Sequence, residues 1–261
     1  MAKYKIWWQS TMREGDYPEY TKAIADHAKK FLPDEYEIEM HGVKNGSDHV
    51  NMIAGKYFND REVLRYMLEA KERKFDAVVF GCTQDPILDE ARELLDIPVF
   101  SMLQTSLQWA QMYGTRPAIL HYSNDYMYKL LPRLLQKYRA EDIVVKTTPF
   151  DITFDTLMEA LLNDPEPAID MSLKAAKEAV NKGADIIIPS CGLLNLILAR
   201  NGIKEVPGTG VTIMDLTAIL LKVAMAGIQL HEEAGLVRSN AGFYKRMTDE
   251  QIEEIKEHYH L

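Results

Sequence analysis

The sequence predicts an α/β protein made of two similar halves, each a parallel sheet with helices on both faces. Short β-like runs alternate with longer helical runs along the 261 residues, which is typical of parallel sheets. Two continuous apolar runs, FDAVVFGC (75–82) and ADIIIPSC (184–191), indicate strands covered on both faces. Each run is preceded by a helix end and followed by a second helix and a proline-marked segment. This shared order of elements indicates an internal repeat of one α/β unit.

The first half of the chain is expected to hold four strands and four helices. The segment 36–43 alternates apolar and polar residues, which predicts a strand. The helix from 60 opens on Asp60, which suits an N-cap, and the helix from 85 has Pro86 just inside its start. In order, strands 3–10, 36–43, 75–82 and 97–102 alternate with helices 18–32, 60–74, 85–95 and 104–114.

The second half repeats the pattern and then ends in helices. Gly183 is a natural C-cap for the helix before the second apolar run. Thr248 and Gln251 have the spacing of a capping box, which predicts a helix in the tail. Strands 116–123, 142–150 and 184–191 alternate with helices 125–140, 166–183 and 192–202, and helices 211–233 and 248–260 follow. The first residues of 211–233 are also compatible with a strand.

Composition excludes several classes of function. The net charge of −9 and the absence of a Lys/Arg cluster argue against binding to nucleic acid. No run approaches the roughly 18 apolar residues of a membrane span, and the first residues lack the apolar core of a signal peptide. We therefore expect a cytoplasmic protein with reduced thiols.

A Gly-rich nucleotide fingerprint and metal-ligand spacings are lacking, so neither a cofactor nor a metal is expected. The expected partner is a small-molecule substrate, and a symmetric homo-oligomer is the generic expectation.

The two cysteines, Cys82 and Cys191, are the candidate catalytic residues. Each directly follows a buried strand, and ligands of parallel sheets bind beyond the carboxyl ends of strands. Each also precedes an expected helix, whose N-terminus favours an anion and would lower the thiol pKa. A buried cysteine is often only a small hydrophobe. Two cysteines at matching positions of a repeat instead indicate an acid/base pair, placed so that two thiols approach one substrate carbon.

Three segments carry a resemblance to a known family. FDAVVFGCTQDPILDEARELLDIPV (75–99) resembles the first cysteine motif of the aspartate/glutamate/hydantoin racemase superfamily, in the hydantoin-racemase form with Asp-Pro shortly after the cysteine. GADIIIPSCG (183–192) resembles the second cysteine motif. VPGTGVTIMDLTAILLKVA (206–224) resembles the segment that leads into a helix packing back on the first lobe. The chain thus resembles hydantoin racemase-like members over roughly residues 3–235.

The resemblance implies a fold, an activity and a set of residues. The fold is two pseudo-symmetric lobes with the active site in the cleft between them, here 1–114 with about 211–261, and 115–210. The activity is a cofactor-independent racemase or epimerase that acts on an acidic carbon of a small carboxylate or hydantoin-type substrate. Cys82 and Cys191 match the paired acid/base thiols. The residues implied in substrate binding are Thr83, Gln84 and Gly192 beside the thiols, Gln9, Ser10 and Thr11 in the loop after the first strand, and Tyr122 and Ser123.

Departures from the family pattern keep alternatives open. Gln9 stands where amino-acid racemases typically have Asp-Ser and hydantoin racemases Asn-Pro-Asn-Thr. Gly192 and two leucines follow Cys191 in place of Thr-His, which argues against glutamate as the substrate. The aromatic residues Trp7 and Trp8 suit either an apolar substituent or the core. A maleate-type cis-trans isomerase or C–C lyase of the same fold is one alternative. A two-lobed small-molecule binding protein is the other.

Overall fold

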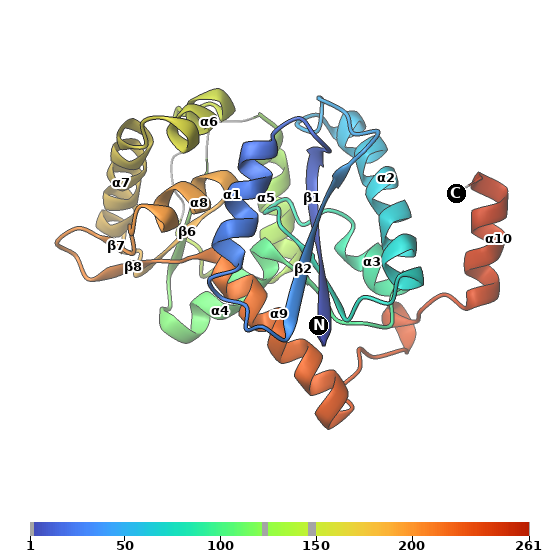
Figure 1. The fold of residues 1–261 in the computed structure, drawn as a ribbon. Coiled ribbons are helices and arrows are strands. Elements are labelled where there is room, and N and C mark those ends of the chain that lie inside the picture. The colour runs from blue at the N-terminus through green and yellow to red at the C-terminus, as the bar shows by residue number, and fades with distance from the viewer. Residues whose placement is uncertain (1–2, 122–124, 146–149, 261) are drawn as a thin grey trace.

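Two four-stranded sheets, one from each half of the chain, form the scaffold of the fold (Figure 1). The computed structural model describes residues 3–121, 125–145 and 150–260. The first sheet has the order β2-β1-β3-β4 and is parallel throughout. The second has the order β5-β6-β8-β7, in which the short β7 pairs antiparallel with β8. The strands are β1 (Tyr4–Arg13), β2 (Tyr36–Val43), β3 (Ala77–Phe80), β4 (Val99–Ser101), β5 (Pro117–Leu120), β6 (Ile186–Pro189), β7 (Glu205–Val206) and β8 (Val211–Ile213).

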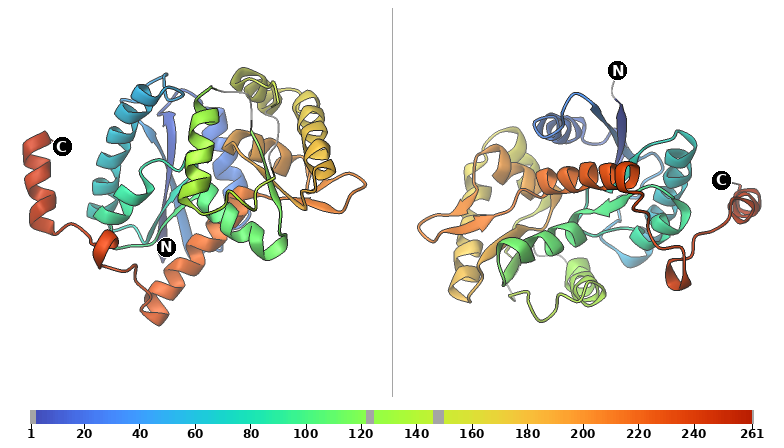
Figure 2. Two further views of the ribbon diagram at one scale, coloured as in Figure 1. Left: turned by 180° about the vertical axis from the view of Figure 1, so that it is seen from behind. Right: turned by 90° about the horizontal axis from the view of Figure 1, so that it is seen from below.

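Helices cover both faces of the sheets, which confirms the predicted α/β class (Figure 2). Helices α2 and α3 pack on one side of the first sheet, and α9 contacts β3 and β4 from the other side. Because α9 also contacts α8 of the second half, it joins the two halves. The helices are α1 (Pro18–Ala28), α2 (Ile53–Glu72), α3 (Leu88–Leu94), α4 (Met102–Tyr113), α5 (Asp125–Lys137), α6 (Phe154–Leu162), α7 (Glu166–Asn181), α8 (Gly192–Arg200), α9 (Leu216–Ala234) and α10 (Asp249–Tyr259), with a 3₁₀ turn η1 (Gly242–Tyr244).

The predicted repeat is visible in equivalent backbone contacts of the two sheets. Asp76 and Asp185 each stand six residues before a cysteine. Asp76 Oδ2 accepts a 2.7 Å hydrogen bond from the N–H of Lys5, and Asp185 Oδ1 accepts one of 2.8 Å from the N–H of Arg116. In both halves the carboxylate thus fixes the start of the cysteine-bearing strand against its neighbour. In each half the cysteine-bearing strand also pairs in parallel with the first strand of that half, β3 with β1 and β6 with β5, so the two cysteines follow equivalent strand ends.

Some predicted elements were wrong. Helix α2 begins at Ile53, so Asp60 lies inside the helix and does not cap it. The predicted strand 142–150 is reduced, within the described residues, to a parallel bridge between Val145 and Ala118 of β5, and its residues 146–149 lie outside them. Helix α6 had no counterpart in the prediction. The capping box of α10 is confirmed, with Thr248 and Gln251 as its two members.

The core lies on both faces of the first sheet because strand side chains alternate between faces. In β1 the fully buried Ile6 and Trp8 belong to the larger core cluster, whereas Trp7 points into a second cluster under α2 and α3. Helix α10 lies beside α2, where Lys71 contacts Asp249 (Figure 1). No helix in the described parts of the chain is long and apolar enough to cross a membrane. The division of the chain into lobes at residues 114 and 210 stays a prediction.

Candidate active site

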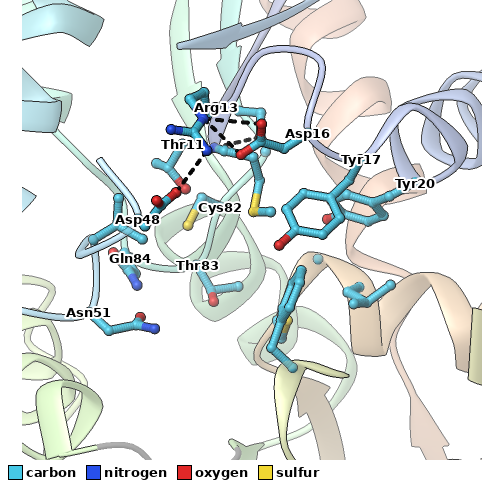
Figure 3. Close-up of a pocket in the computed structure, with 18 of the residues that line it drawn as sticks. Thr11, Arg13, Asp16, Tyr17, Tyr20, Asp48, Asn51, Cys82, Thr83 and Gln84 are labelled. Carbon is cyan, nitrogen blue, oxygen red and sulfur yellow. Dashed lines mark hydrogen bonds and ion pairs between the residues drawn. The ribbon is translucent and has the colours of Figure 1, made fainter. Parts of the chain in front are cut away.

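The carboxyl ends of the central strands open on a cavity of about 300 Å³ (Figure 3). Both halves of the chain contribute to its wall, and so do both cysteines. The predicted site residues that line it are Ser10, Thr11, Cys82, Thr83, Gln84, Cys191 and Gly192. Ser10 and Thr11 were expected in a loop after the first strand, but β1 continues to Arg13 and carries them. The fold therefore brings most of the predicted residues to one place.

Cys191 is held at the start of a helix, as predicted. It is the N-cap residue of α8, with an extended backbone at φ −173°. Its side chain makes no capping hydrogen bond, but the N–H groups of Leu193 and Leu194 favour the thiolate. Burial has the larger effect, and with the nearby negative charge of Cys82 it raises the pKa of Cys191 to about 11. The prediction of a lowered thiol pKa was wrong because the helix N-terminus acts in a half-buried setting.

Cys82 follows β3 but is not at a helix N-terminus, since α3 begins only at Leu88. The N–H of Gln84, the hydroxyl of Thr11 and the positive charge of Lys56 favour the thiolate, yet burial outweighs them and raises the pKa of Cys82. Each thiol is thus protonated in the resting site at neutral pH. The thiols also differ in what supports their charged forms.

The turns that carry the two cysteines touch each other. The buried hydroxyl of Ser190 lies 3.2 Å from the Thr83 hydroxyl and donates to it. A β-carbon on Gly192 would lie 3.2 Å from the carbonyl oxygen of Gly81 and 2.9 Å from the Tyr20 hydroxyl. Gly81 is itself packed against the indole of Trp8, which would come within 2.2 Å of an added β-carbon. This close approach fixes the two thiol-bearing turns relative to one another.

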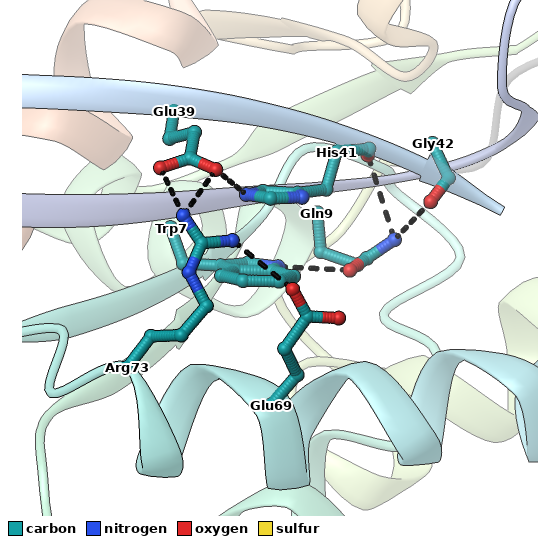
Figure 4. A network of polar contacts seen from close by, with 7 residues as sticks. All are labelled: Trp7, Gln9, Glu39, His41, Gly42, Glu69 and Arg73. Carbon is teal, nitrogen blue, oxygen red and sulfur yellow. Dashed lines mark hydrogen bonds and ion pairs between the residues drawn. The ribbon is translucent and has the colours of Figure 1, made fainter.

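Gln9 does not line the cavity, contrary to the prediction (Figure 4). Its side chain is fully buried between β1 and β2. There it accepts a 2.9 Å hydrogen bond from the indole N–H of Trp7 and donates to the carbonyls of Ser10 and Gly42 at 2.8 and 3.2 Å. Trp7 in turn stacks on His41, with ring centroids 3.3 Å apart. Gln9 therefore supports the strand, and Trp7 belongs to the core.

The remaining predicted residues, Tyr122 and Ser123, lie outside the described residues. Their role in substrate binding therefore stays a prediction.

A charged group at the cavity wall was not foreseen from the sequence (Figure 3). Arg13, at the end of β1, donates through Nε to both carboxylate oxygens of Asp16, at 2.9 and 3.1 Å. Its Nη2 lies 3.2 Å from Oδ1 of Asp48. All three residues line the cavity. The only sequence signal for them was their place in the segments that follow β1 and β2, where parallel strands present their carboxyl ends.

The arrangement offers proton-transfer chemistry. Two thiols from equivalent strand ends share one cavity, and hydroxyls and a helix N-terminus stand beside them. Among the described residues, no group of three His, Cys, Asp or Glu side chains is placed to hold a metal ion. The chemistry that these residues can perform by themselves is abstraction and delivery of a proton at a carbon made acidic by a neighbouring carbonyl.

Comparisons with known proteins show the family and the fold of this chain. A family model described as "Asp/Glu/Hydantoin racemase" matches residues 18–224. A protein named hydantoin racemase from Pseudomonas sp. (strain NS671) is 27% identical over 184 residues, covering 66% of this chain and 67% of the relative. One of the same name from Rhizobium meliloti is 25% identical over 185 residues, or 70% of each chain. The structure of allantoin racemase from Klebsiella pneumoniae superposes with a TM-score of 0.79 at 18% identity, covering 94% of each chain, and so shares the fold.

Proposed function

The chain belongs to the Asp/Glu/hydantoin racemase family and is an isomerase of the racemase type, and we propose that it racemises a neutral cyclic ureide of the hydantoin type. Cys82 and Cys191 act as the two proton-transferring groups. The observation that carries the proposal is that both thiols, which follow equivalent strands of the two sheets, line one cavity. The family match and the curated relatives favour a racemase over the alternatives, which are a maleate-type cis-trans isomerase, a C–C lyase and a small-molecule binding protein.

The reaction as proposed needs one thiolate and one thiol. The thiolate takes the proton from the ring carbon next to the carbonyl, and the electron pair left behind moves onto the carbonyl oxygen. The N-terminus of α8 and the hydroxyl of Thr11 stabilise this negative charge. The second thiol then delivers its proton to the opposite face of the carbon. The two thiols have exchanged protonation states, and the enzyme is ready for the mirror-image substrate.

The charges of the cavity wall support a neutral substrate. Arg13 is paired with both Asp16 and Asp48, so the three groups together carry one negative charge. An amino-acid carboxylate would enter a wall that already carries a net negative charge, and it would compete with both aspartates for Arg13. A cyclic ureide has no such cost, because its N–H and C=O groups can bond to the same side chains without displacing them. The names of the curated relatives point to the same class of substrate.

Hydrogen–deuterium exchange tests the proposal directly. The wild-type protein is incubated in D₂O with 5-substituted hydantoins, amino acids, 2-substituted malonates and maleate, and each is followed by proton NMR and polarimetry. With the wild-type protein, we expect the C5 proton signal and the optical rotation of a hydantoin to disappear together. With a Cys82→Ala/Cys191→Ala double variant, we expect both to persist. Loss of carboxylate from a malonate, or conversion of maleate, with inert hydantoins would overturn the proposal in favour of the alternatives.

A further inference from the structure

A buried carboxylate next to the first thiol has no part in the proposed chemistry. Asp85 lies three residues after Cys82 and is 4% exposed. It does not line the cavity. Its Oδ1 accepts a 2.9 Å hydrogen bond from the N–H of Leu103, and its Oδ2 accepts bonds of 2.8 Å from the N–H of Gln104 and from the hydroxyl of Tyr138. The carboxylate therefore joins three separate parts of the chain.

Two of these bonds cap a helix that lacks a cap of its own. Leu103 and Gln104 are the second and third residues of α4, whose free N–H groups need acceptors. The N-cap residue of α4, Ser101, makes no capping bond with its side chain. Asp85 supplies this bond from a distant turn, and its negative charge suits the positive end of the helix. Because α4 leads from β4 to β5, this cap fixes the turn that carries Cys82 to the helix that connects the two sheets.

The third bond reaches α5 of the second half. Tyr138 directly follows α5 and packs against both core clusters of the protein. One residue earlier, Lys137 forms a 2.8 Å ion pair with Asp89 of α3. The end of α5 therefore contacts the chain on both sides of Pro86.

The turn held by these contacts is strained. Asp85 has φ +43° and Ile87 has φ +42°, on either side of Pro86. A left-handed backbone is costly for a residue other than glycine, and most of all for a β-branched residue such as Ile87. Strain of this kind persists only where surrounding contacts enforce it. The turn that carries Cys82 is therefore held by contacts made from elsewhere in the fold.

We propose that Asp85 is a positioning residue for Cys82: its carboxylate fixes the strained turn to α4 and Tyr138 and so aims the first thiol at the substrate carbon. The effect that this role has on turnover rests on the proposed racemase function. Its effect on the reactivity of the Cys82 thiol does not. Cys191 has no comparable dependence, because its turn is part of helix α8. Loss of the Asp85 carboxylate is therefore expected to disturb one thiol and spare the other.

The test uses Asp85→Asn, since asparagine tolerates the left-handed backbone but replaces one acceptor oxygen of the carboxylate by an NH2 group that cannot accept a hydrogen bond. Alkylation by iodoacetamide is measured on each thiol alone, in Cys191→Ala and Cys82→Ala backgrounds. We expect Asp85→Asn to change the alkylation rate of Cys82 by about fivefold or more and that of Cys191 by less than twofold. In the protein with both thiols, kcat should fall about tenfold or more while KM changes by less than about threefold.

Asp185→Asn is the matched control, because Asp185 also accepts three hydrogen bonds, at 2.7 to 2.8 Å, but at the far end of its strand. It should lower stability and leave the reactivity of both thiols unchanged. Tyr138→Phe removes one bond to Asp85 and should act as Asp85→Asn does, more weakly; it decides the matter if Asp85→Asn does not fold.

Unchanged Cys82 alkylation in folded Asp85→Asn, or an equal change at both thiols, overturns the proposal whether or not racemisation is found. If Cys82 alone responds while the wild-type protein racemises no hydantoin, the positioning role stands and the proposed function fails.

Discussion

The two cysteine-bearing turns begin alike and then diverge. Both follow a strand that pairs in parallel with the first strand of its half. In both, the N–H of the preceding residue, Gly81 or Ser190, donates to a carbonyl of that neighbouring strand, at 2.9 and 2.7 Å. After Cys191 the chain enters α8 at once, and nearby N–H groups support the thiolate. After Cys82 the chain makes a strained turn that Asp85 fastens to distant parts of the fold.

This difference shows two ways to place the same chemical group. A thiol at a helix N-terminus is positioned by local structure, since the N–H groups that favour its thiolate belong to the next residues along the chain. The other thiol is positioned by tertiary structure, and so it depends on contacts between segments more than 15 residues apart.

The largest difference between the two turns should appear when their glycines are replaced. In Gly81→Ala the new β-carbon would lie 2.2 Å from the indole of Trp8, which is 1% exposed and has no room to move. In Gly192→Ala its nearest neighbour is the Tyr20 hydroxyl, 2.9 Å away at the end of a side chain that lines the cavity. We expect Gly81→Ala to lower the free energy of unfolding by about 3 kcal/mol and Gly192→Ala by about 1 kcal/mol. Urea denaturation measures both, and equal losses would contradict the packing described.

The pH dependence of turnover should reflect the raised pKa of both thiols. The proposed mechanism needs one thiolate, whereas burial raises the pKa of Cys191 to about 11 and also raises that of Cys82. The active fraction of the free enzyme therefore grows with pH, and kcat/KM should rise up to about tenfold per unit between pH 7 and 9. Initial rates in buffers of constant ionic strength measure this slope. A flat profile, or a maximum below pH 8, would show that one thiol is already ionised at neutral pH.

The same pKa shift has a consequence for stability of the opposite sign. A thiol whose pKa is raised by folding holds its proton more tightly in the folded state. The resulting stabilisation is complete below the ordinary thiol pKa, 9.0, and is lost as the pH rises toward about 11, the pKa of Cys191. Activity should therefore increase over a range in which the protein becomes less stable.

Arg13 lies apart from both turns and should affect binding more than chemistry. Arg13→Ala removes a donor from the cavity wall and leaves Asp16 and Asp48 unpaired. We expect KM for a hydantoin to rise about tenfold, which is the value of one hydrogen bond to a charged group, while kcat changes by less than about threefold. Arg65→Ala is the matched control, because Arg65 has the same side-chain exposure, 41%, and an ion pair with Glu62 outside the cavity. A fall in kcat with unchanged KM would instead place Arg13 in the proton-transfer step.

The smallest effect should come from the contact that joins the two turns. Ser190→Ala removes the hydroxyl that donates to Thr83 and leaves that buried hydroxyl without its donor. The expected loss of stability is about 1 kcal/mol. A double-mutant cycle with Thr83→Val isolates this coupling in denaturation experiments. A coupling energy near zero would mean that the turns hold their relative position without this bond.

The sequence predicted those parts of the fold that local patterns determine. The buried strands before both cysteines were found because their residues form continuous apolar runs, and the capping box of α10 because Thr248 and Gln251 are three residues apart. Helix α2 was placed too late because its first turns, around Ile53 and Phe58, expose apolar side chains and show no periodicity. The sequence pattern therefore indicated the presence of this helix but not its start.

The parts of the site that the sequence could not predict depend on tertiary contacts. Gln9 was expected in the cavity, but β1 continues past it to Arg13, so the alternation of side chains places Gln9 on the same face as Trp7, which belongs to the second core cluster. The role of Asp85 could not be predicted from its place three residues after Cys82, because its partners lie on α4 and directly after α5. The rise in the pKa of both thiols follows from burial, which no local pattern around a cysteine reveals.

The most direct test of the account asks whether the two thiols approach opposite faces of one carbon. Each enantiomer of a 5-substituted hydantoin is incubated separately in D₂O with Cys82→Ala and with Cys191→Ala, and loss of the C5 proton is followed by NMR. The account predicts that each variant exchanges the proton of one enantiomer only, and that the two variants act on opposite enantiomers. Exchange of the same enantiomer by both variants, or of both enantiomers at the wild-type rate, would contradict it.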